Sequence, residues 1–140
     1  MNIGIVQIYD NNIKDYAEYS RLINAMYANQ KGYTYICFEY DLVPTNISVY
    51  YNKIIAVNNI LEDKRNFDWI LYLDSDAIIT NFVYNIEDII NRHITKEIIF
   101  AQDSNGINNG VFLIKNTPNM KNFLKDVYTD RNFFHTTTPE

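Results

Sequence analysis

The chain has 140 residues, which is enough for one domain with a buried core and too few for two comfortable ones. Hydrophobic residues make up 47% of it and aromatic residues 15%, which excludes a disordered chain. The net charge of -5 argues against a general nucleic-acid binder, which needs a basic face, and against a polybasic membrane anchor. We therefore expect a single domain over residues 1–140.

Targeting signals are not visible in the sequence. No stretch approaches eighteen continuous apolar residues, so we predict no membrane span. The first ten residues have neither the basic start nor the long apolar core of a signal peptide. The single cysteine, Cys37, lies in an apolar run and is expected to be a small buried side chain. A reducing cytoplasm is the simplest compartment for such a chain.

The first half of the chain predicts two strands that alternate with two helices. Apolar runs at residues 3–9 and 34–40 are typical of strands. Apolar residues recur every three or four positions over about 13–30 and again over about 48–64, which predicts two helices, and Gly32 is suited to end the first. The predicted apolar faces are Tyr16, Tyr19, Ile23, Met26 and Tyr27 in the first helix, and Tyr50, Ile54, Val57 and Leu61 in the second.

The second half predicts three more strands, over residues 69–74, 97–102 and 110–116. A short helix is expected to begin at Asn85, and a last helix at Thr117, which is followed by proline and is a suitable N-cap. The predicted apolar faces are Ile86, Ile89, Ile90 and Ile94 in the short helix, and Met120, Phe123, Leu124, Val127 and Tyr128 in the last.

Alternation of strands and helices is typical of an α/β fold, in which parallel strands are joined by right-handed crossovers. In such sheets, ligands bind beyond the carboxyl ends of the strands. Asp74 ends the apolar strand at residues 69–74, and Asp76 follows it, in the sequence LYLDSDAIIT. The two acids are therefore expected at the binding edge of the sheet.

Two carboxylates one residue apart can both reach one divalent ion. Mg²⁺ and Mn²⁺ prefer oxygen ligands and commonly bind one or two carboxylates, water and substrate phosphates. Such an ion would turn the repulsion between Asp74, Asp76 and a diphosphate into attraction. The alternative is that both are ordinary loop residues, with Asp76 capping the next turn.

A second polar segment follows the fourth predicted strand. Asp103 ends that strand in the sequence AQDSNGINNGVFLIKN, and a loop rich in asparagine and glycine follows. Amide side chains can donate and accept hydrogen bonds at once, which suits sugar hydroxyls, and glycine lets the backbone approach a ligand closely. The alternative is a flexible turn. The loop residues concerned are Asn105, Gly106, Asn108, Asn109 and Gly110.

These segments together resemble a known family. WILYLDSDAIIT, followed by NNGVFLIKN, resembles nucleotide-sugar glycosyltransferases of the GT-A fold, most closely the retaining galactosyl-, mannosyl- and xylosyltransferases of family GT34. YANQKGYTYICFEYD and YYNKIIAVNNIL add to the resemblance, which covers most of residues 3–128. It implies a Rossmann-like α/β/α sandwich with a mostly parallel sheet. It also implies metal-dependent transfer of a hexose or pentose from a nucleotide-diphosphate sugar, UDP-sugar favoured, to a glycan or glycoprotein acceptor, with retention.

The resemblance also implies roles for individual residues. Asp74 and Asp76 would hold Mn²⁺ (or Mg²⁺) and through it the donor diphosphate, and Asp74 would also reach the ribose. No catalytic residue is assigned, although Asp103 and Asn109 are candidates for positioning the donor sugar. Lys53 would approach the phosphate or the sugar, unless it is a solvated helix lysine. The remaining donor-binding set is Gln7 and Tyr9 by the base and ribose, Ser75 between the two acids, Asn108 by the donor sugar, and Gly110 after it.

The sequence departs from the family pattern at its carboxyl end. The family has an Asp-Gln pair soon after the helix that ends near Asp130, and a later metal-binding histidine. His135 is too early to be that ligand, and His93 is expected to be structural. The chain therefore resembles a C-terminally truncated form that carries the donor half of the site. Without the membrane anchor of eukaryotic members, it would suit a bacterium or a large DNA virus. A protein encoded by a virus would then be expected in the host cytoplasm.

Two other functions are compatible with parts of the sequence. LYLDSDAIIT also resembles the aspartate motif of haloacid-dehalogenase phosphatases, but there the acid normally ends the first strand. A nucleotide-sugar-binding fragment without transfer activity is the second alternative, because the carboxyl-terminal groups of the family are missing.

Overall fold

The computed structural model describes residues 1–130 and confirms an α/β fold built on one five-stranded sheet of order β2-β1-β3-β5-β4. Strands β1 (Ile3–Ile8), β2 (Thr34–Phe38) and β3 (Trp69–Leu73) are paired in parallel. Strand β5 (Gly106–Lys115) is antiparallel both to β3 and to β4 (Ile98–Asp103). Among the described strands only β5 runs against the others, so the sheet is mostly parallel, as expected.

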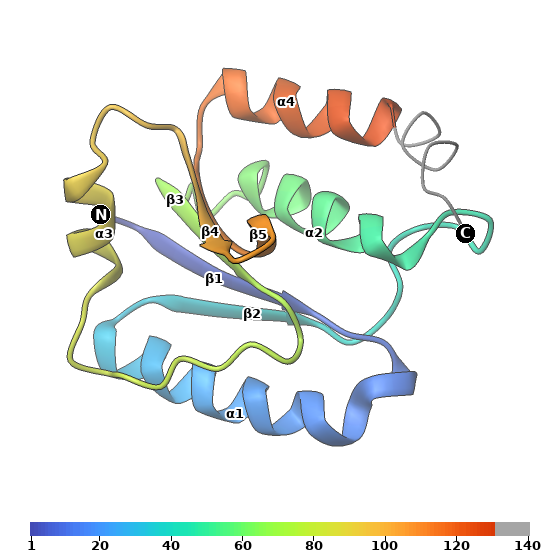
Figure 1. The fold of residues 1–140 in the computed structure, drawn as a ribbon, viewed down its shortest axis with the longest axis horizontal. Coiled ribbons are helices and arrows are strands. Elements are labelled where there is room, and N and C mark those ends of the chain that lie inside the picture. Colours follow the sequence, from blue (N-terminus) through green and yellow to red (C-terminus); the bar gives the residue numbers. More distant parts are fainter. Residues whose placement is uncertain (131–140) are drawn as a thin grey trace.

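Helices cover both faces of the sheet (Figure 1). Helices α2 (Asn52–Leu61) and α4 (Pro118–Thr129) lie on one face, and α1 (Lys14–Lys31) and α3 (Ile86–Arg92) contribute to the core on the other. The arrangement is the predicted α/β/α sandwich. None of the helices within residues 1–130 is long and apolar enough to cross a membrane.

The central strand β3 shows why the sheet is covered on both sides. All five of its residues are buried. Successive side chains of a strand point to opposite faces, so Ile70 and Tyr72 join the core beneath α2 and α4. Trp69, Leu71 and Leu73 join the core beneath α1 and α3. A strand that is apolar at every position therefore needs a helix layer on each side.

Several predicted helix ends are confirmed. Gly32 ends α1 with a φ of 76°, a left-handed conformation that favours glycine. Thr117 caps α4 by accepting a hydrogen bond from the Met120 amide, with Pro118 in the first turn. Asn85 forms a capping box at the start of α3.

The buried face of α1 differs from the prediction. Tyr16, Tyr19 and Met26 are 55%, 70% and 64% exposed. Two faces of this helix carry residues that recur every three or four positions. The face that packs against the sheet is the one with the smaller side chains. The polar members of that face hydrogen-bond to the chain segment that follows β3. The buried residues of α1 are Ala17, Ser20, Asn24, Tyr27 and Ala28.

Helices α2 and α3 also expose some residues that the pattern placed inside. Val57 and Leu61 are buried as expected, but Tyr50 is 78% exposed because it lies in a 3₁₀ turn, η2 (Val49–Tyr51), that precedes α2. Ile89 is partly exposed although it lies within α3, and Ile94 is exposed because α3 ends at Arg92.

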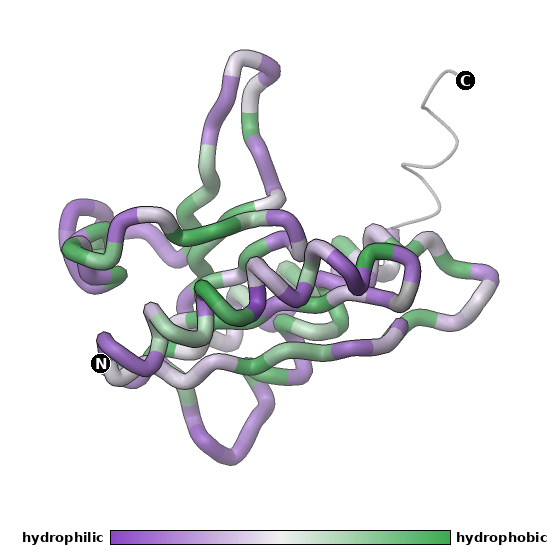
Figure 2. The backbone as a smooth tube through the Cα atoms, turned by 90° about the horizontal axis from the view of Figure 1, so that it is seen from below, coloured by the Kyte–Doolittle hydropathy of each residue, from purple (hydrophilic) through white to green (hydrophobic). Residues whose placement is uncertain are grey.

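The asparagine-rich segment is not the separate loop that the sequence predicts. It forms the first part of β5 and pairs with the end of β4 in a hairpin, with a register shift between Phe100 and Ala101. Gly106 sits in the hairpin turn with a φ of 113°, which a residue with a side chain rarely adopts. Figure 2 shows this largely hydrophilic hairpin projecting from the body of the protein.

Candidate functional site

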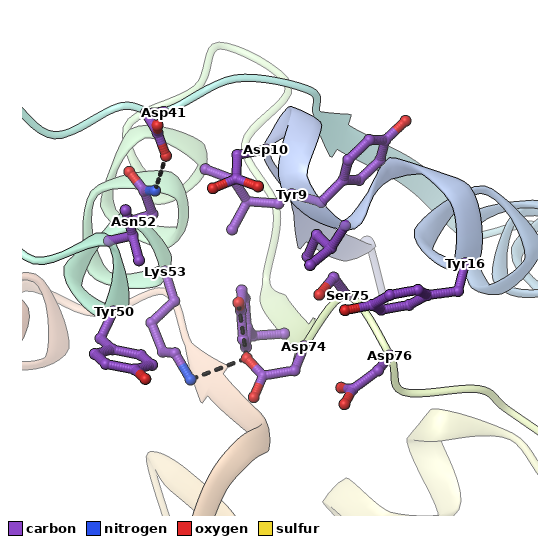
Figure 3. A pocket seen from close by; sticks show the side chains of 14 residues that line it. Tyr9, Asp10, Tyr16, Asp41, Tyr50, Asn52, Lys53, Asp74, Ser75 and Asp76 are labelled. Carbon is purple, nitrogen blue, oxygen red and sulfur yellow. Dashed lines mark hydrogen bonds and ion pairs between the residues drawn. The ribbon is translucent and has the colours of Figure 1, made fainter.

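A cleft of about 470 Å³ opens at the carboxyl ends of β1 and β3 (Figure 3). This is the edge at which ligands bind in parallel α/β sheets. Its lining includes two exposed tyrosines and both predicted metal ligands. Among the lining residues are Tyr9, Tyr16, Tyr50, Lys53, Asp74 and Asp76.

Asp74 is held in one orientation by two neighbours. Its Oδ1 atom accepts a hydrogen bond from the Lys53 Nζ atom at 2.9 Å and another from the Tyr72 hydroxyl at 3.0 Å. Tyr72 and Asp74 are two residues apart in an extended chain, so both face α2, which carries Lys53. Burial and the nearby Asp74 carboxylate raise the pKa of the Tyr72 phenol, so this hydroxyl is a hydrogen-bond donor at neutral pH. The Asp74 carboxylate is therefore oriented before any ligand arrives.

Lys53 is largely buried for a lysine. Its side chain is 12% exposed, and its Nζ atom lies 5.3 Å from the centroid of the Tyr72 ring, a cation–π geometry. The same Nζ atom donates to the Asn109 carbonyl at 3.3 Å. The alternative of a solvated helix lysine is wrong, because Lys53 lies in the cleft beside Asp74.

Asp76 has a different environment from Asp74. Its side chain is exposed, and no group within residues 1–130 donates a hydrogen bond to its carboxylate. In Figure 3 it lies on the same side of the cleft as Tyr16, with Lys53 on the other side of Asp74. Ser75, between the two acids, also lines the cleft, and its carbonyl accepts a hydrogen bond from the Ser20 hydroxyl.

The carboxylate oxygens of Asp74 and Asp76 suit a divalent ion that also binds a substrate. The Asp74 Oδ2 atom and both oxygens of Asp76 accept no hydrogen bond from the described part of the chain, so they remain available as ligands. Within residues 1–130 no three His, Cys, Asp or Glu side chains are grouped so that they could hold a metal ion. Two carboxylates alone leave an octahedral ion open to water and phosphate oxygens. Mn²⁺ or Mg²⁺ binding by Asp74 and Asp76 stays a prediction.

Gln7 has another role than the one expected. The sequence places it by the base and ribose of a donor, but only 1% of it is exposed. Its Nε2 atom donates to the Asp74 carbonyl at 3.0 Å, and its Oε1 atom accepts from the Tyr35 hydroxyl at 2.6 Å. Gln7 therefore supports the segment that carries the acids from behind, whereas the neighbouring Tyr9 does line the cleft.

The residues predicted to face a donor sugar lie on the projecting hairpin. The Asp103 carboxylate accepts from the Asn105 amide at 2.7 Å and from the Asn108 side chain at 2.9 Å. These two hydrogen bonds lower the pKa of Asp103, the backbone one first. Asp103 and Asn108 do not line the cleft, whereas Asn109 contacts Lys53 and lines an adjoining apolar hollow of about 270 Å³.

Gly110 is the point at which the hairpin strand touches the acids. Its carbonyl accepts from the Asp74 amide at 2.7 Å. A Cβ atom on Gly110 would lie 2.7 Å from the Asp74 Oδ2 atom, closer than such atoms approach in proteins. Only glycine fits at this position without moving the Asp74 side chain.

Sequence reasoning missed several residues of the cleft. Asp10 and Asp41 each follow a strand, so the rule that identified Asp74 could have identified them too. Tyr16 and Tyr50 were assigned to buried helix faces, and only the packing shows that they border the cleft. His135 lies outside the described residues, and His93 is an exposed residue at the end of α3.

Comparison with known proteins supports the fold. The chain superposes with a TM-score of 0.79 on a crystal structure of a glycosyltransferase involved in the glycosylation of the major capsid of PBCV-1, at 19% identity, covering 94% of this chain and 68% of that one. It superposes with a TM-score of 0.57 on apo GlyE, a glycosyltransferase of Streptococcus pneumoniae TIGR4, at 17% identity, covering 100% of this chain and 41% of that one. The fold is therefore GT-A, as the resemblance implied.

Sequence comparison gives the family. The chain is 28% identical over 141 aligned positions to the probable alpha-1,2-galactosyltransferase gmh2 of Schizosaccharomyces pombe, covering 74% of this chain. It spans 40% of the length of that relative. The sequence profile of the galactosyl transferase GMA12/MNN10 family matches residues 5–97, more than half of the chain, and the chain belongs to this family.

Proposed function

We propose that this chain binds the donor of a metal-dependent glycosyltransferase, which moves a hexose or pentose from a nucleotide-diphosphate sugar to a glycan or glycoprotein acceptor. A UDP-sugar is the favoured donor, and retention is the favoured outcome. The observation that carries the proposal is the pair Asp74 and Asp76 in one cleft at the carboxyl ends of β1 and β3, in a member of a galactosyl transferase family.

Asp74 and Asp76 would hold Mn²⁺ or Mg²⁺ together with the donor diphosphate. The ion, when bound, supplies Lewis-acid stabilisation of the negative charge on the departing diphosphate. The protein contributes a carboxylate that Lys53 and Tyr72 already orient, so little ordering is needed when the ligand arrives. Asp76 supplies the second carboxylate without having to break a hydrogen bond to the described residues.

The other cleft residues suit the remaining parts of a nucleotide sugar. The Lys53 ammonium group lies beside the acids, where it adds a positive charge for phosphate oxygens. Tyr16 and Tyr50 present exposed rings at the cleft, and such faces can stack on a base or on the apolar face of a sugar ring. A volume of about 470 Å³ is within the usual range for small-molecule sites.

Binding and transfer are separate proposals for this chain. It spans 40% of the length of its yeast relative, so groups that place the acceptor and stabilise charge at the anomeric carbon need not lie within residues 1–130. We propose that the donor binds to these 140 residues and that transfer by them is weak. The family match favours this function over the haloacid-dehalogenase alternative.

Calorimetry with UDP tests the binding step. UDP titrated in the presence of Mn²⁺ is expected to bind at least about tenfold more tightly than UDP titrated with EDTA, because the two carboxylates repel a bare diphosphate. Equal affinity in both titrations would contradict the proposal. A panel of UDP-glucose, UDP-galactose and GDP-mannose then ranks the donors.

Product assays test the chemistry. The chain is incubated with Mn²⁺, each donor and candidate glycan acceptors, and sugar transfer is measured. Tight donor binding without product would support a binding fragment. Release of phosphate from a generic aryl phosphate would instead indicate the phosphatase.

A further inference from the structure

Buried polar side chains are concentrated around the cleft. The polar residues that are buried within residues 1–130 are Gln7 (1% exposed), Ser20 (1%), Asn24 (0%) and Asn52 (6%). Burying an amide or hydroxyl is costly unless it makes hydrogen bonds, so the partners of these four side chains show what they are for. All four bond to chain segments that border the cleft.

Asn24 makes three of these bonds. From the buried face of α1, its Nδ2 atom donates to the Ala77 carbonyl at 2.8 Å, and its Oδ1 atom accepts from the Ile79 amide at 2.9 Å. The same Nδ2 atom donates to the Gln7 Oε1 atom at 3.1 Å. The Asn24 side chain thus hydrogen-bonds to two backbone positions of the segment at residues 74–79, here called the carboxylate loop.

Gln7 and Ser20 hold the beginning of the carboxylate loop. Gln7 donates to the carbonyl of Asp74, and the Ser20 hydroxyl donates to the carbonyl of Ser75. The loop contains no helix or strand, so beyond the Asp74 amide, which donates to the Gly110 carbonyl, its backbone groups have no ladder to join. Side chains of β1 and α1 take the place of that ladder, from the side opposite the cleft.

The opposite wall of the cleft is built in the same way. The Asn52 Oδ1 atom accepts from the amides of Leu42 and Val43 at 2.8 and 3.0 Å. Its Nδ2 atom donates to the Asp41 carboxylate at 2.7 Å. These four buried polar residues are therefore used at the two irregular segments that flank the site.

We propose that Asn24, supported by Gln7 and Ser20, is a positioning residue that holds Asp74 and Asp76 so that one divalent ion can bind both. This inference rests on the proposed function, because it concerns the geometry of the predicted metal–diphosphate site. A structural role alone would stabilise the fold without changing how much metal the site requires. The positioning role changes that requirement.

The test uses Asn24→Ala and Ser20→Ala in the 140-residue chain, with Asn116→Ala as a matched control. The Asn116 amide also donates to two backbone carbonyls, of Leu61 and Phe67, but at the opposite edge of the sheet. The measurement is the Mn²⁺ concentration that half-saturates UDP binding at a fixed UDP concentration, alongside the melting temperature without ligand. Ser20→Thr, which keeps the hydroxyl, provides a conservative variant.

We expect Asn24→Ala to raise the Mn²⁺ requirement about tenfold, as is typical when a group that orients metal ligands is removed. Ser20→Ala should raise it by a smaller factor, and Ser20→Thr should restore it. Asn116→Ala should lower the melting temperature and leave the Mn²⁺ requirement unchanged. If Asn24→Ala does not fold, the contrast between Ser20→Ala and Ser20→Thr decides the question.

The two ways of failing are distinguishable. Metal-dependent UDP binding by the wild type, with the same Mn²⁺ requirement in the Asn24 and Ser20 variants, overturns the positioning role alone. Equal changes in the Asn24 and Asn116 variants overturn it as well. If the wild type shows no metal-dependent binding, the proposed function is wrong and the positioning role falls with it.

Discussion

The carboxylate loop and the tip of the β4–β5 hairpin make an instructive pair. Both are polar segments that follow an apolar strand, and the sequence suggests ligand contact for both. The carboxylate loop lies in the cleft and is held by side chains of β1 and α1. The hairpin tip projects from the body (Figure 2). Its side-chain bonds, such as that between Asp103 and Asn108, join its own residues.

A polar segment at a strand end becomes a built site when other elements hold it. Where its strand leaves the tip, the hairpin meets the carboxylate loop at Gly110 against Asp74, and it meets α2 at Asn109 beside Lys53. We therefore expect the effect of substitutions to fall along the path from the loop to the tip. The predictions below test that gradient.

Replacement of Asp76 should have the largest effect on binding. Asp76→Ala removes a metal ligand, and we expect the affinity for UDP with Mn²⁺ to fall by more than about 100-fold, since even groups that only orient ligands contribute about 10–100-fold. Its carboxylate has no partner in the described chain, so the melting temperature without metal should stay unchanged. Calorimetry and thermal melting measure the two quantities.

Asp74→Ala serves as the comparison for that variant. It should weaken metal-dependent binding to a similar extent, but it also leaves Lys53 and the Tyr72 hydroxyl without their shared acceptor. We expect this to lower the free energy of unfolding by about 1–3 kcal/mol in the absence of metal. Equal stability losses in both Asp variants would contradict the different environments described for the two acids.

Gly110→Ala should have the next largest effect. The new Cβ atom would lie 2.7 Å from the Asp74 Oδ2 atom, so the carboxylate must move away from its present position. We expect UDP affinity with Mn²⁺ to fall about 30-fold, within the range for disturbed metal ligands. Gly106→Ala is a control at the hairpin turn, where a Cβ would meet nothing but the backbone φ is strained. It should lower stability and leave the affinity unchanged.

Lys53→Met should have a moderate effect. It removes a cation that lies 2.9 Å from Asp74 and that can attract phosphate oxygens, so we expect UDP binding to weaken. The loss should be only about tenfold, because Asp74 is 38% exposed and solvent screens part of the charge. Mn²⁺ binding without nucleotide should weaken less, because the loss of a positive charge near the ion partly offsets the loss of one group that orients Asp74. Lys121→Met, which breaks the ion pair with Glu62 on the α4 side, is the matched control and should leave UDP affinity unchanged. A loss of Mn²⁺ affinity in Lys53→Met as large as the loss of UDP affinity would contradict a phosphate-side role.

Much of the fold follows from the sequence because local signals agree there. The continuous apolar run of β3 and the caps at Gly32 and Thr117 each depend on a few neighbouring residues. The choice of buried face in α1 does not. Tyr16 and Tyr19 have the periodicity of a core face, but Ser20 and Asn24 are buried in their place because they bond to a loop some 50 residues away in sequence.

The residues of the site also differ in whether neighbouring or distant parts of the chain determine their role. Asp74 and Asp76 could be predicted because a strand end in a parallel sheet is a ligand position whatever the rest of the fold does. Gln7 could not, because whether its amide faces a ligand or the back of a loop depends on Tyr35 and Asn24, which neighbouring elements bring to it. The pairing of Asp103 with Asn108 depends likewise on a hairpin that extends further than its apolar residues indicate.

Substitutions in the hairpin should have the smallest effects, and these distinguish two adjacent asparagines. Asn109 borders the hollow beside Lys53, whereas the side chain of Asn108 bonds within the hairpin, to Asp103 and the Gly110 amide. We expect Asn109→Ala to weaken UDP-hexose binding about fivefold, which corresponds to about 1 kcal/mol for one hydrogen bond, while UDP binding is unchanged. Asn108→Ala should leave both affinities within about twofold of the wild type, since solvent-exposed bonds of this kind contribute little. Calorimetry with both ligands measures the four values.

Equal losses for UDP and UDP-hexose in Asn109→Ala would show that this residue acts on the carboxylate loop through Lys53 instead of on the sugar. A larger loss in Asn108→Ala than in Asn109→Ala would show that the hairpin tip folds over the cleft when the donor binds, and the gradient from loop to tip would then be wrong.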